Sequence, residues 1–275
     1  MPSLYVVGTP IGNMEDISAR ALRVLRGVAV IATEDTRTTR KLLTHYDIHT
    51  RLVSFQEHNA AVRIPTLLST LEENDVALVT EAGTPGVSDP GASLVAAAGQ
   101  QGIPVVSVPG PSSVTAAVSI SGFPGERFLF VGFLPRRRGE RKRLFQSLTN
   151  EQQTIVALES PHRIQATLAD MLDVWGTRRI AVCRELTKLH EEVFRGTLQA
   201  AVDYFQEPRG EFTLVIQGAE SKAPVDSAEV RSTAHEELLQ LKAQGTGAKD
   251  AVALVVQSTG LPRKVVYALW LELQA

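Results

Sequence analysis

The sequence predicts an α/β protein, with a parallel-sheet N-terminal domain, an α+β mixed-sheet domain after it and a small helical tail. Three observations predict this fold class. The chain has 275 residues, close to the size at which a single hydrophobic core stops growing. In its first half, short apolar runs alternate with amphipathic stretches, as in a parallel sheet covered by helices. In its second half the apolar runs have fewer helices between them, which favours antiparallel pairing.

The first domain is expected over residues 1–121. Its strands are the apolar runs at 4–7, 28–32, 52–53, 76–79 and 105–108. The amphipathic stretches between them, and an alanine-rich stretch from 113 to about 121, are the expected helices. Because ligands usually bind at the carboxyl ends of parallel strands, the loops after these strands are candidate binding loops.

The second domain is expected over residues 122–219, with strands at 128–131, 154–158, 180–183, 193–196 and 212–216.

A third segment, 227–275, follows the polar stretch 220–226 and predicts helices only. Helices at 248–257 and 261–273 flank a turn, which is the layout of a helix-turn-helix. One apolar face of the second helix is formed by Leu261, Val265, Val266, Leu269 and Leu273. The layout suits nucleic-acid binding, and the apolar face suits packing on the body of the protein or on a second subunit. The sequence leaves these alternatives open.

Composition excludes several classes of protein. The single cysteine, Cys183, excludes a disulfide framework, a cysteine-rich zinc site and a three-cysteine cluster, and we expect no metal site. The chain shows neither a basic leader nor a long apolar run, so we expect a cytoplasmic protein without a membrane span. A net charge of −2 provides no general attraction to nucleic acid, so RNA binding requires a local basic patch.

A basic run at residues 136–143 is one such patch, with six cations and one anion. The cations are Arg136, Arg137, Arg138, Arg141, Lys142 and Arg143. Runs of this kind are often only a solvated helix face. In a chain of slightly negative net charge, however, this concentration predicts contacts with RNA phosphates.

Three loops rich in glycine and proline follow predicted strands, at residues 8–13, 81–91 and 109–113. Glycine permits close approach of the backbone to a ligand, and proline stiffens the rim of a site. None of the loops matches the phosphate-binding or the dinucleotide-binding glycine pattern, which disfavours ATP hydrolysis and hydride transfer. Together at successive strand ends, they predict one ligand crevice.

Seven motifs occur in an order that resembles a known family. They lie at residues 8–13, 34–37, 58–59, 83–91, 109–113, 159–163 and 184–188. They resemble the RsmI family of ribosomal small-subunit RNA 2′-O-methyltransferases, within the tetrapyrrole methylase superfamily, over roughly residues 4 to 275. The wider superfamily usually carries G-x-G-P-G-D in the first loop and G-D-P in the second. This chain instead has Gly8-Thr9-Pro10-Ile11-Gly12-Asn13 and Gly83-Thr84-Pro85, a departure that favours the RNA branch.

The resemblance implies the two-domain tetrapyrrole-methylase fold, a homodimer, and a cofactor, S-adenosyl-L-methionine, folded into the cleft between the domains. The implied partner is small ribosomal subunit RNA, and the implied reaction is 2′-O-methylation of a ribose, at a cytidine of the decoding region of 16S ribosomal RNA. The implied donor-binding residues are Thr9, Pro10, Thr84, Val87, Ser88, Ser112, Ser113, Ser160, Glu185, Phe212 and Thr213.

A ribose hydroxyl is a poor nucleophile, so a base or a cation that stabilises the developing alkoxide should help. The candidates in the polar motifs for substrate and RNA contacts are Glu34, Asp35, Arg37, His58, Asn59, Glu159, Arg163 and Arg184. Lys188 and Glu185 rank first for catalysis, because they lie in the 184–188 motif of the second domain.

Other interpretations remain open. Glu34, Arg37, Arg163 and Arg184 would equally suit structural ion pairs at the domain joint. A tetrapyrrole C-methyltransferase would share the fold, but would need a wide apolar cleft. A non-catalytic RNA-binding ribosome assembly factor would retain the fold without turnover.

Overall fold

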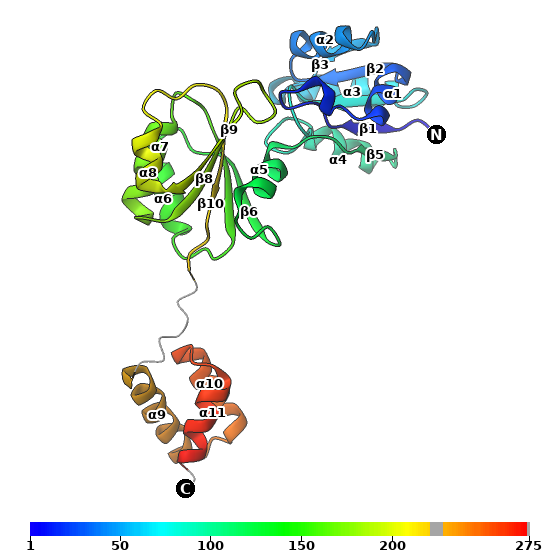
Figure 1. The fold of residues 1–275 in the computed structure, drawn as a ribbon. Coiled ribbons are helices and arrows are strands. Elements are labelled where there is room, and N and C mark those ends of the chain that lie inside the picture. Colours follow the sequence, from blue (N-terminus) through cyan, green and yellow to red (C-terminus); the bar gives the residue numbers. More distant parts are fainter. Residues whose placement is uncertain (221–227, 274–275) are drawn as a thin grey trace. The chain divides into compact units, whose positions relative to one another are not determined.

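The computed structural model describes residues 1–220 and 228–273, and it divides into two compact units, Met1–Ala219 and Glu220–Ala275 (Figure 1). Most of the polar stretch 220–226, residue 227 and the last two residues of the predicted tail lie outside the described residues.

The first sheet is parallel throughout, with the strand order β3-β2-β4-β1-β5. Its strands are β1 (Leu4–Val7), β2 (Val30–Thr33), β3 (Arg51–Ser54), β4 (Val76–Val79) and β5 (Val105–Val108). The central strands β2 and β4 are buried along their whole length, as expected for a parallel sheet covered on both faces. The predicted parallel sheet is therefore confirmed.

Two layers of helices cover this sheet. They are α1 (Ala19–Gly27), α2 (Thr36–His45), α3 (Ala60–Thr70) and α4 (Ala92–Gln100), with short 3₁₀ turns at Met14–Asp16 (η1) and Glu57–Asn59 (η2). Leu25 of α1 and Leu43 of α2 share one core with Ile31 of the sheet. Leu67 of α3 packs with Leu78 in a second core. Helices α1 and α2 therefore cover one face, and α3 and α4 cover the other.

The second sheet is mixed, with the order β6-β7-β10-β8-β9. Its strands are β6 (Phe128–Phe133), β7 (Thr154–Glu159), β8 (Arg179–Arg184), β9 (Glu192–Thr197) and β10 (Phe212–Ile216). Only β6 and β7 pair in parallel; the other pairs are antiparallel. The predicted mixed sheet is confirmed.

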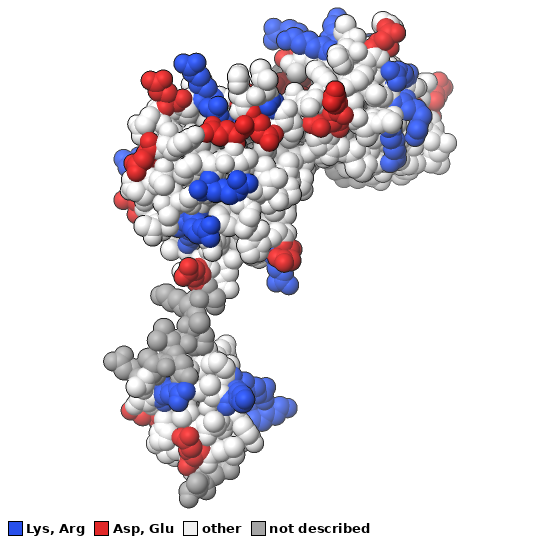
Figure 2. Space-filling view, in the orientation of Figure 1, with Lys and Arg blue, Asp and Glu red and all other residues white. Residues whose placement is uncertain are grey.

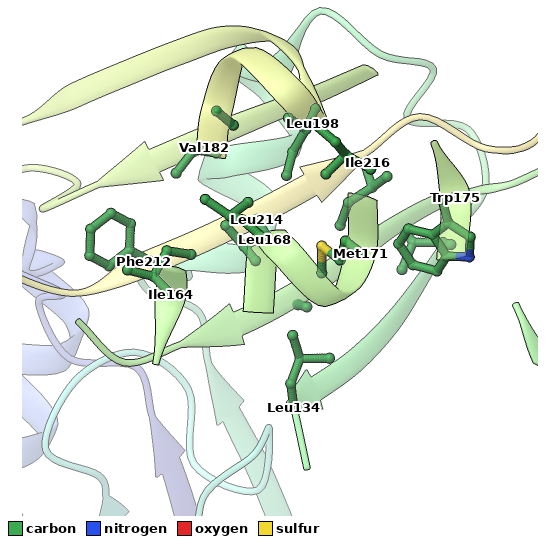
Figure 3. Packing of buried hydrophobic residues seen from close by; sticks show 14 of the residues in the cluster. Leu134, Ile164, Leu168, Met171, Trp175, Val182, Leu198, Phe212, Leu214 and Ile216 are labelled. Atoms are coloured by element: carbon green, nitrogen blue, oxygen red, sulfur yellow. The ribbon is translucent and has the colours of Figure 1, made fainter. Parts of the chain in front are cut away.

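Three helices cover one face of the second sheet: α6 (Arg138–Ser147), α7 (Ile164–Trp175) and α8 (Leu198–Tyr204). Leu168 and Met171 of α7 pack with Leu214 and Ile216 of β10 in this core (Figure 3). Among the described residues, three α-helices lie between the strands of the second sheet and four between those of the first, so the expectation of fewer helices in this half is confirmed. Most residues of α6 are charged or polar and α8 has only seven residues, so neither shows a long apolar stripe in the sequence.

The helix α5 (Ser113–Ser121) packs on the second sheet, whereas the sequence prediction included it in the first domain. Its side chains Val114 and Val118 pack with Val156, Ala181 and Val215 of the second sheet. Strands β7, β8 and β10 carry apolar side chains on both faces, so the face opposite α7 also needs a cover. The chain therefore passes to the second sheet before Ser113, because hydrophobic periodicity does not indicate which sheet a helix covers.

The C-terminal unit consists of α9 (Ala228–Ala243), α10 (Ala248–Thr259) and α11 (Arg263–Glu272). Gly260, at φ 72°, ends α10 in the left-handed conformation that glycine adopts without strain. The predicted apolar face packs inside this unit: Leu261, Val266 and Leu269 are buried against residues of α9 and α10. Among the helices of the described residues, none is both long and apolar enough to cross a membrane.

Candidate functional site

The loops after β1 and β4 are tied together by backbone hydrogen bonds. The Thr9 amide donates to the Gly83 carbonyl at 2.9 Å, and the Gly83 amide donates to the Thr9 carbonyl at 3.1 Å. The buried Thr9 hydroxyl donates to the Thr80 carbonyl at 3.3 Å. The sequence-predicted donor residue Thr9 therefore uses its polar atoms to join two loops.

Two glycines of the first loop are required by close packing. A Cβ atom on Gly8 would lie 2.8 Å from Gly110, and one on Gly12 would lie 2.4 Å from Cγ of Lys188 and 2.9 Å from the Leu186 carbonyl. Real Cβ atoms essentially never approach this closely. The first loop therefore packs against the third loop of the first sheet and against the 184–188 motif of the second sheet.

A cavity of about 550 Å³ lies where these loops meet the carboxyl ends of β7 and β8, and it is lined from both sheets. Eight of the eleven predicted donor residues line it: Thr84, Val87, Ser88, Ser112, Ser113, Ser160, Phe212 and Thr213. Two predicted substrate residues, Glu34 and Glu159, line it as well. Thr9, Pro10 and Glu185 do not.

Sequence reasoning missed several lining residues. Three are acidic, Glu81, Asp89 and Glu211, and the others include Ile11, Val114, Phe133, Leu158, Cys183 and Leu186. Glu81 and Asp89 lie inside the 81–91 loop that the sequence singled out, so polar type and position after a strand were available signals. Burial raises the pKa of the Cys183 thiol to about 11, so this lining residue is a neutral thiol.

Three carboxylates lie at the end of the first sheet: Glu34 and Asp89 are partly exposed, and Glu81 is exposed. Partial desolvation raises the pKa of each of them. Like charge adds to each shift: Asp89 raises the pKa of Glu34, Glu34 raises that of Glu81, and Glu81 raises that of Asp89. Binding of a cation, or protonation of one carboxylate, would therefore reduce the repulsion between these groups.

A second cavity, of about 690 Å³, adjoins the first one and shares Glu34, Ser88 and Asp89 with it. Its other lining residues are Gln56, Glu57, His58, Gly86 and Pro90. His58 is thus placed at this cavity as an exposed side chain. Asn59 supports the wall, since its Oδ1 accepts a hydrogen bond from the Gln56 amide at 2.9 Å.

Ser88 adopts φ 65°, a conformation that costs a non-glycine residue energy and that is concentrated at functional sites. The strain lies in the wall between the two cavities.

The predicted catalytic residues Lys188 and Glu185 do not line the first cavity, but both contact a residue that does. Lys188 Nζ contacts Glu185 Oε1 at 2.9 Å and Glu211 Oε2 at 3.0 Å, and of these three only Glu211 lines the cavity. Partial burial lowers the pKa of Lys188, but its hydrogen bonds with Glu185 and Glu211 outweigh that effect and raise it. Glu185 Oε1 also accepts from the Glu211 amide at 2.9 Å. Lys188 is therefore a fixed cation that holds a cavity residue.

Some of the predicted substrate residues are structural ion pairs. Glu159 is buried and contacts Arg163 at 2.6 Å, and its Oε2 accepts from the Thr167 hydroxyl at 2.7 Å. Arg184 Nε lies 3.1 Å from Glu192 Oε2. Arg163 and Arg184 are therefore in structural ion pairs, as the alternative interpretation expected. Both pairs lie within the second sheet and its helices and not at the joint between the domains.

Asp35 and Arg37 lie at the first turn of α2. The Asp35 carboxylate caps this helix by accepting from the Arg37 amide at 2.7 Å, and this hydrogen bond lowers the pKa of Asp35. The Arg37 side chain is 91% exposed. Arg37 is therefore not a buried ion pair at the domain joint.

The basic run is largely neutralised from within the chain. The Arg141 side chain is 5% exposed and pairs with Asp170, whose other oxygen lies 2.8 Å from Nε of Arg138. Lys142 pairs with Asp173, and Arg137 lies 3.4 Å from Glu140. The prediction that Arg141 contacts RNA is wrong, because its guanidinium is buried. Two further cations of the run are exposed, Arg136 and Arg143.

Comparison with protein families matches residues 3–202 to the tetrapyrrole (corrin/porphyrin) methylases and residues 229–274 to the RsmI C-terminal HTH domain. The chain is 45% identical to ribosomal RNA small subunit methyltransferase I of Synechocystis, covering 100% of this chain and 99% of the relative. It is 41% identical to the protein of the same name from Halalkalibacterium halodurans (98% and 94% covered) and 49% identical to that from Thermotoga maritima (80% and 100% covered).

Solved structures share the fold. A uroporphyrin-III-C-methyltransferase from Thermus thermophilus has a TM-score of 0.57 at 22% identity, with 79% of this chain and 94% of that chain covered. A diphthine synthase has a TM-score of 0.61 at 16% identity, covering 78% and 89%. At these identities the likeness supports the arrangement of the two sheets and nothing about substrate.

Proposed function

Because this chain belongs to the RsmI branch of the tetrapyrrole methylases, we propose that it transfers a methyl group from S-adenosylmethionine to a ribose 2′-hydroxyl of 16S ribosomal RNA, at a cytidine of the decoding region. The relatives named for this activity on small-subunit RNA match the chain over nearly its whole length. The proposal includes a homodimer, as the family resemblance implies, and a cytoplasmic location, where ribosomal subunits are found.

The observation that carries the proposal is the cavity shared by the two sheets. Its volume of about 550 Å³ is in the range of small-molecule sites. Hydroxyl groups of Ser112, Ser113 and Ser160 line it beside the apolar side chains of Leu158 and Phe212. This mixture fits a donor that has a nucleoside, an amino-acid group and a methyl sulfonium. When bound, S-adenosylmethionine supplies an activated methyl group, so positioning accounts for much of the catalysis.

Carboxylates at the wall fit a cationic donor. Like charge raises the pKa of Glu34, Glu81 and Asp89, so a neighbouring positive charge relieves an unfavourable arrangement. A metal is not needed for this fit.

The second cavity fits the acceptor nucleotide, since it shares a wall with the first and carries polar side chains such as Gln56 and His58. Asp89 borders both cavities, and its raised pKa makes it a better base than an ordinary aspartate. In the proposal Asp89 accepts the ribose proton, and Glu34 is its neighbour at the same wall. Lys188 and Glu185 are retained as positioning residues that hold Glu211 at the donor cavity.

The polar second cavity also disfavours the rival tetrapyrrole C-methyltransferase, which would need a wide apolar cleft. An assay with labelled S-adenosylmethionine distinguishes the two activities. The protein is incubated with purified small subunits that lack the modification and, separately, with a porphyrinogen. Label in a 2′-O-methylated nucleoside supports the proposal, whereas label in the porphyrinogen supports the rival. Donor binding without transfer to either acceptor would contradict the proposal, and failure to bind the donor would favour a non-catalytic assembly factor.

A further inference from the structure

We propose that the exposed face of α1 and α2 binds the phosphate backbone of the RNA that flanks the methylated ribose. The proposal rests on the proposed function for its substrate and adds a surface to it. This α1–α2 basic face is defined by Arg20, Arg23, Arg26, Arg37, Arg40 and Lys41.

The two helices form one surface. Both pack on the same side of the first sheet, where Leu25 of α1 shares a core with Leu42 and Leu43 of α2. The Arg26 guanidinium donates to the Tyr46 carbonyl at 2.8 Å, directly after α2. Cations on α1 and α2 therefore belong to one continuous side of the domain.

The surface carries charge of one sign. Helices α1 and α2 contain six Arg or Lys residues between them and no Asp or Glu, in a chain whose net charge is −2. Figure 2 shows Lys and Arg side chains in two groups, one in the area of α2 and one in the area of α1. Acidic residues occur shortly before each helix, at Asp16 and Asp35. Attraction to a polyanion is therefore local to this face.

The charges are also free. Arg20, Arg23, Arg40 and Lys41 are exposed, and within residues 1–220 and 228–273 none of them has a carboxylate within salt-bridge distance. In α6, by contrast, Arg138, Arg141 and Lys142 pair with two aspartates of α7. Only unpaired cations can replace the counterions of a phosphate backbone without first breaking an internal contact.

The spacing of these cations suits a strand of phosphates. Arg20, Arg23 and Arg26 recur every third residue of α1, and Arg37, Arg40 and Lys41 lie three and four residues apart on α2, so each set occupies one side of its helix. The opposite side of α2 is buried through Thr39, Leu42 and Leu43. Both helices therefore present their cations to solvent.

The face begins beside the site. Glu34 lines both cavities, and α2 starts two residues later, at Thr36. Arg37, in the first turn, is 91% exposed. An RNA strand with its ribose at the Asp89 wall can therefore continue over the start of α2 without leaving the protein surface.

The test compares two double variants of the full chain that remove the same charge. Arg40→Gln/Lys41→Gln alters the α1–α2 basic face. Arg127→Gln/Arg179→Gln removes two exposed cations, one directly before β6 and one at the first residue of β8, at the end of the second sheet opposite the cavity. The affinity of each protein for a decoding-region fragment of 16S RNA is measured over a series of KCl concentrations.

We expect Arg40→Gln/Lys41→Gln to weaken binding at low salt about tenfold or more, and to reduce the slope of log K against log [KCl] by about 1.4 to 1.8, since each lost phosphate contact changes the slope by roughly 0.7 to 0.9. The control is expected to keep the wild-type slope. Equal slopes for both variants, or an unchanged slope for the α2 variant, would overturn the proposal. Methyl transfer by the wild type to small subunits is measured in a separate assay. The proposed activity and the proposed RNA-binding surface can therefore be contradicted independently.

Discussion

Two basic regions of this chain look alike in sequence and differ in structure. The run at 136–143 is the denser one, yet Arg138, Arg141 and Lys142 are held by Asp170 and Asp173 of α7. The cations of α1 and α2 are spread over two helices and lack carboxylate partners among the described residues, apart from Arg37 beside Asp35. The difference teaches that the density of like charge along a chain does not measure the charge available to a ligand.

The same contrast holds for acidic residues. Glu159 is buried but paired with Arg163, and it supports the end of β7. Glu34, Glu81 and Asp89 line one cavity, where partial desolvation and mutual repulsion raise their pKa values. The Glu159–Arg163 pair stabilises the fold, whereas the three carboxylates at the cavity are the ones we assign to function.

The largest effect is expected at Asp89. Asp89→Asn removes the proposed proton acceptor while keeping nearly the same shape, so we expect the methyl-transfer rate to fall by roughly 10² to 10⁴. Binding of S-adenosylmethionine, measured by calorimetry, should persist. Wild-type turnover by the variant would remove Asp89 from the mechanism.

The pH dependence of turnover sharpens the assignment. A base must be deprotonated, and the pKa of Asp89 is raised above its ordinary value of 3.8, so activity should fall with decreasing pH at a higher midpoint than an ordinary aspartate would give. Since the Glu81 charge contributes to this shift, Glu81→Gln should move the midpoint to lower pH. A midpoint unaffected by Glu81→Gln would argue that another group titrates. The control is Glu192→Gln, at a carboxylate of β9 outside both cavities.

A large stability effect is expected at Arg141. Arg141→Met leaves the buried Asp170 without its main partner, and breaking a buried pair in this way costs about 3 to 5 kcal/mol. Urea unfolding, followed by the fluorescence of Trp175, measures this loss, because Trp175 lies in the core that α6 and α7 share. A Trp270→Phe background removes the other tryptophan.

Two companion variants make the Arg141 prediction specific. Arg141→Met/Asp170→Leu should recover part of the lost free energy, because no buried charge is left alone. Arg143→Met, at an exposed position of the same helix, should change the free energy of unfolding by less than about 0.5 kcal/mol. Equal destabilisation by Arg141→Met and Arg143→Met would contradict the structural role of the buried pair.

The smallest effect is expected at Arg137, whose side chain is largely exposed and only 3.4 Å from an exposed Glu140. Exposed pairs of this kind contribute little, so Arg137→Gln should leave the melting temperature unchanged. A clear drop in melting temperature would show that the surface pairs of α6 are also structural.

The sequence predicted the two sheets, since continuous apolar strands and glycine-rich strand ends are local signals. The resemblance also named eight residues that the structure brings to one cavity, including Ser112 and Thr213. The sequence did not predict that α5 covers the second sheet, or that Arg141 is buried, because both depend on partners distant in the chain. Glu81 and Asp89 lie in a loop that the sequence singled out, but the coupling of both to Glu34 depends on how the loops pack.

The central claim is that the methyl group reaches a ribose hydroxyl, and alkaline hydrolysis of the RNA product tests it most directly. Alkali cleaves RNA through a free 2′-hydroxyl, so a 2′-O-methyl group protects the adjacent phosphodiester. After wild-type turnover on small subunits lacking the modification, we predict one gap in the cleavage ladder, at a cytidine of the decoding region. Reaction with Asp89→Asn for the same short time should leave no gap. Incorporation of label with an unbroken ladder would contradict the account.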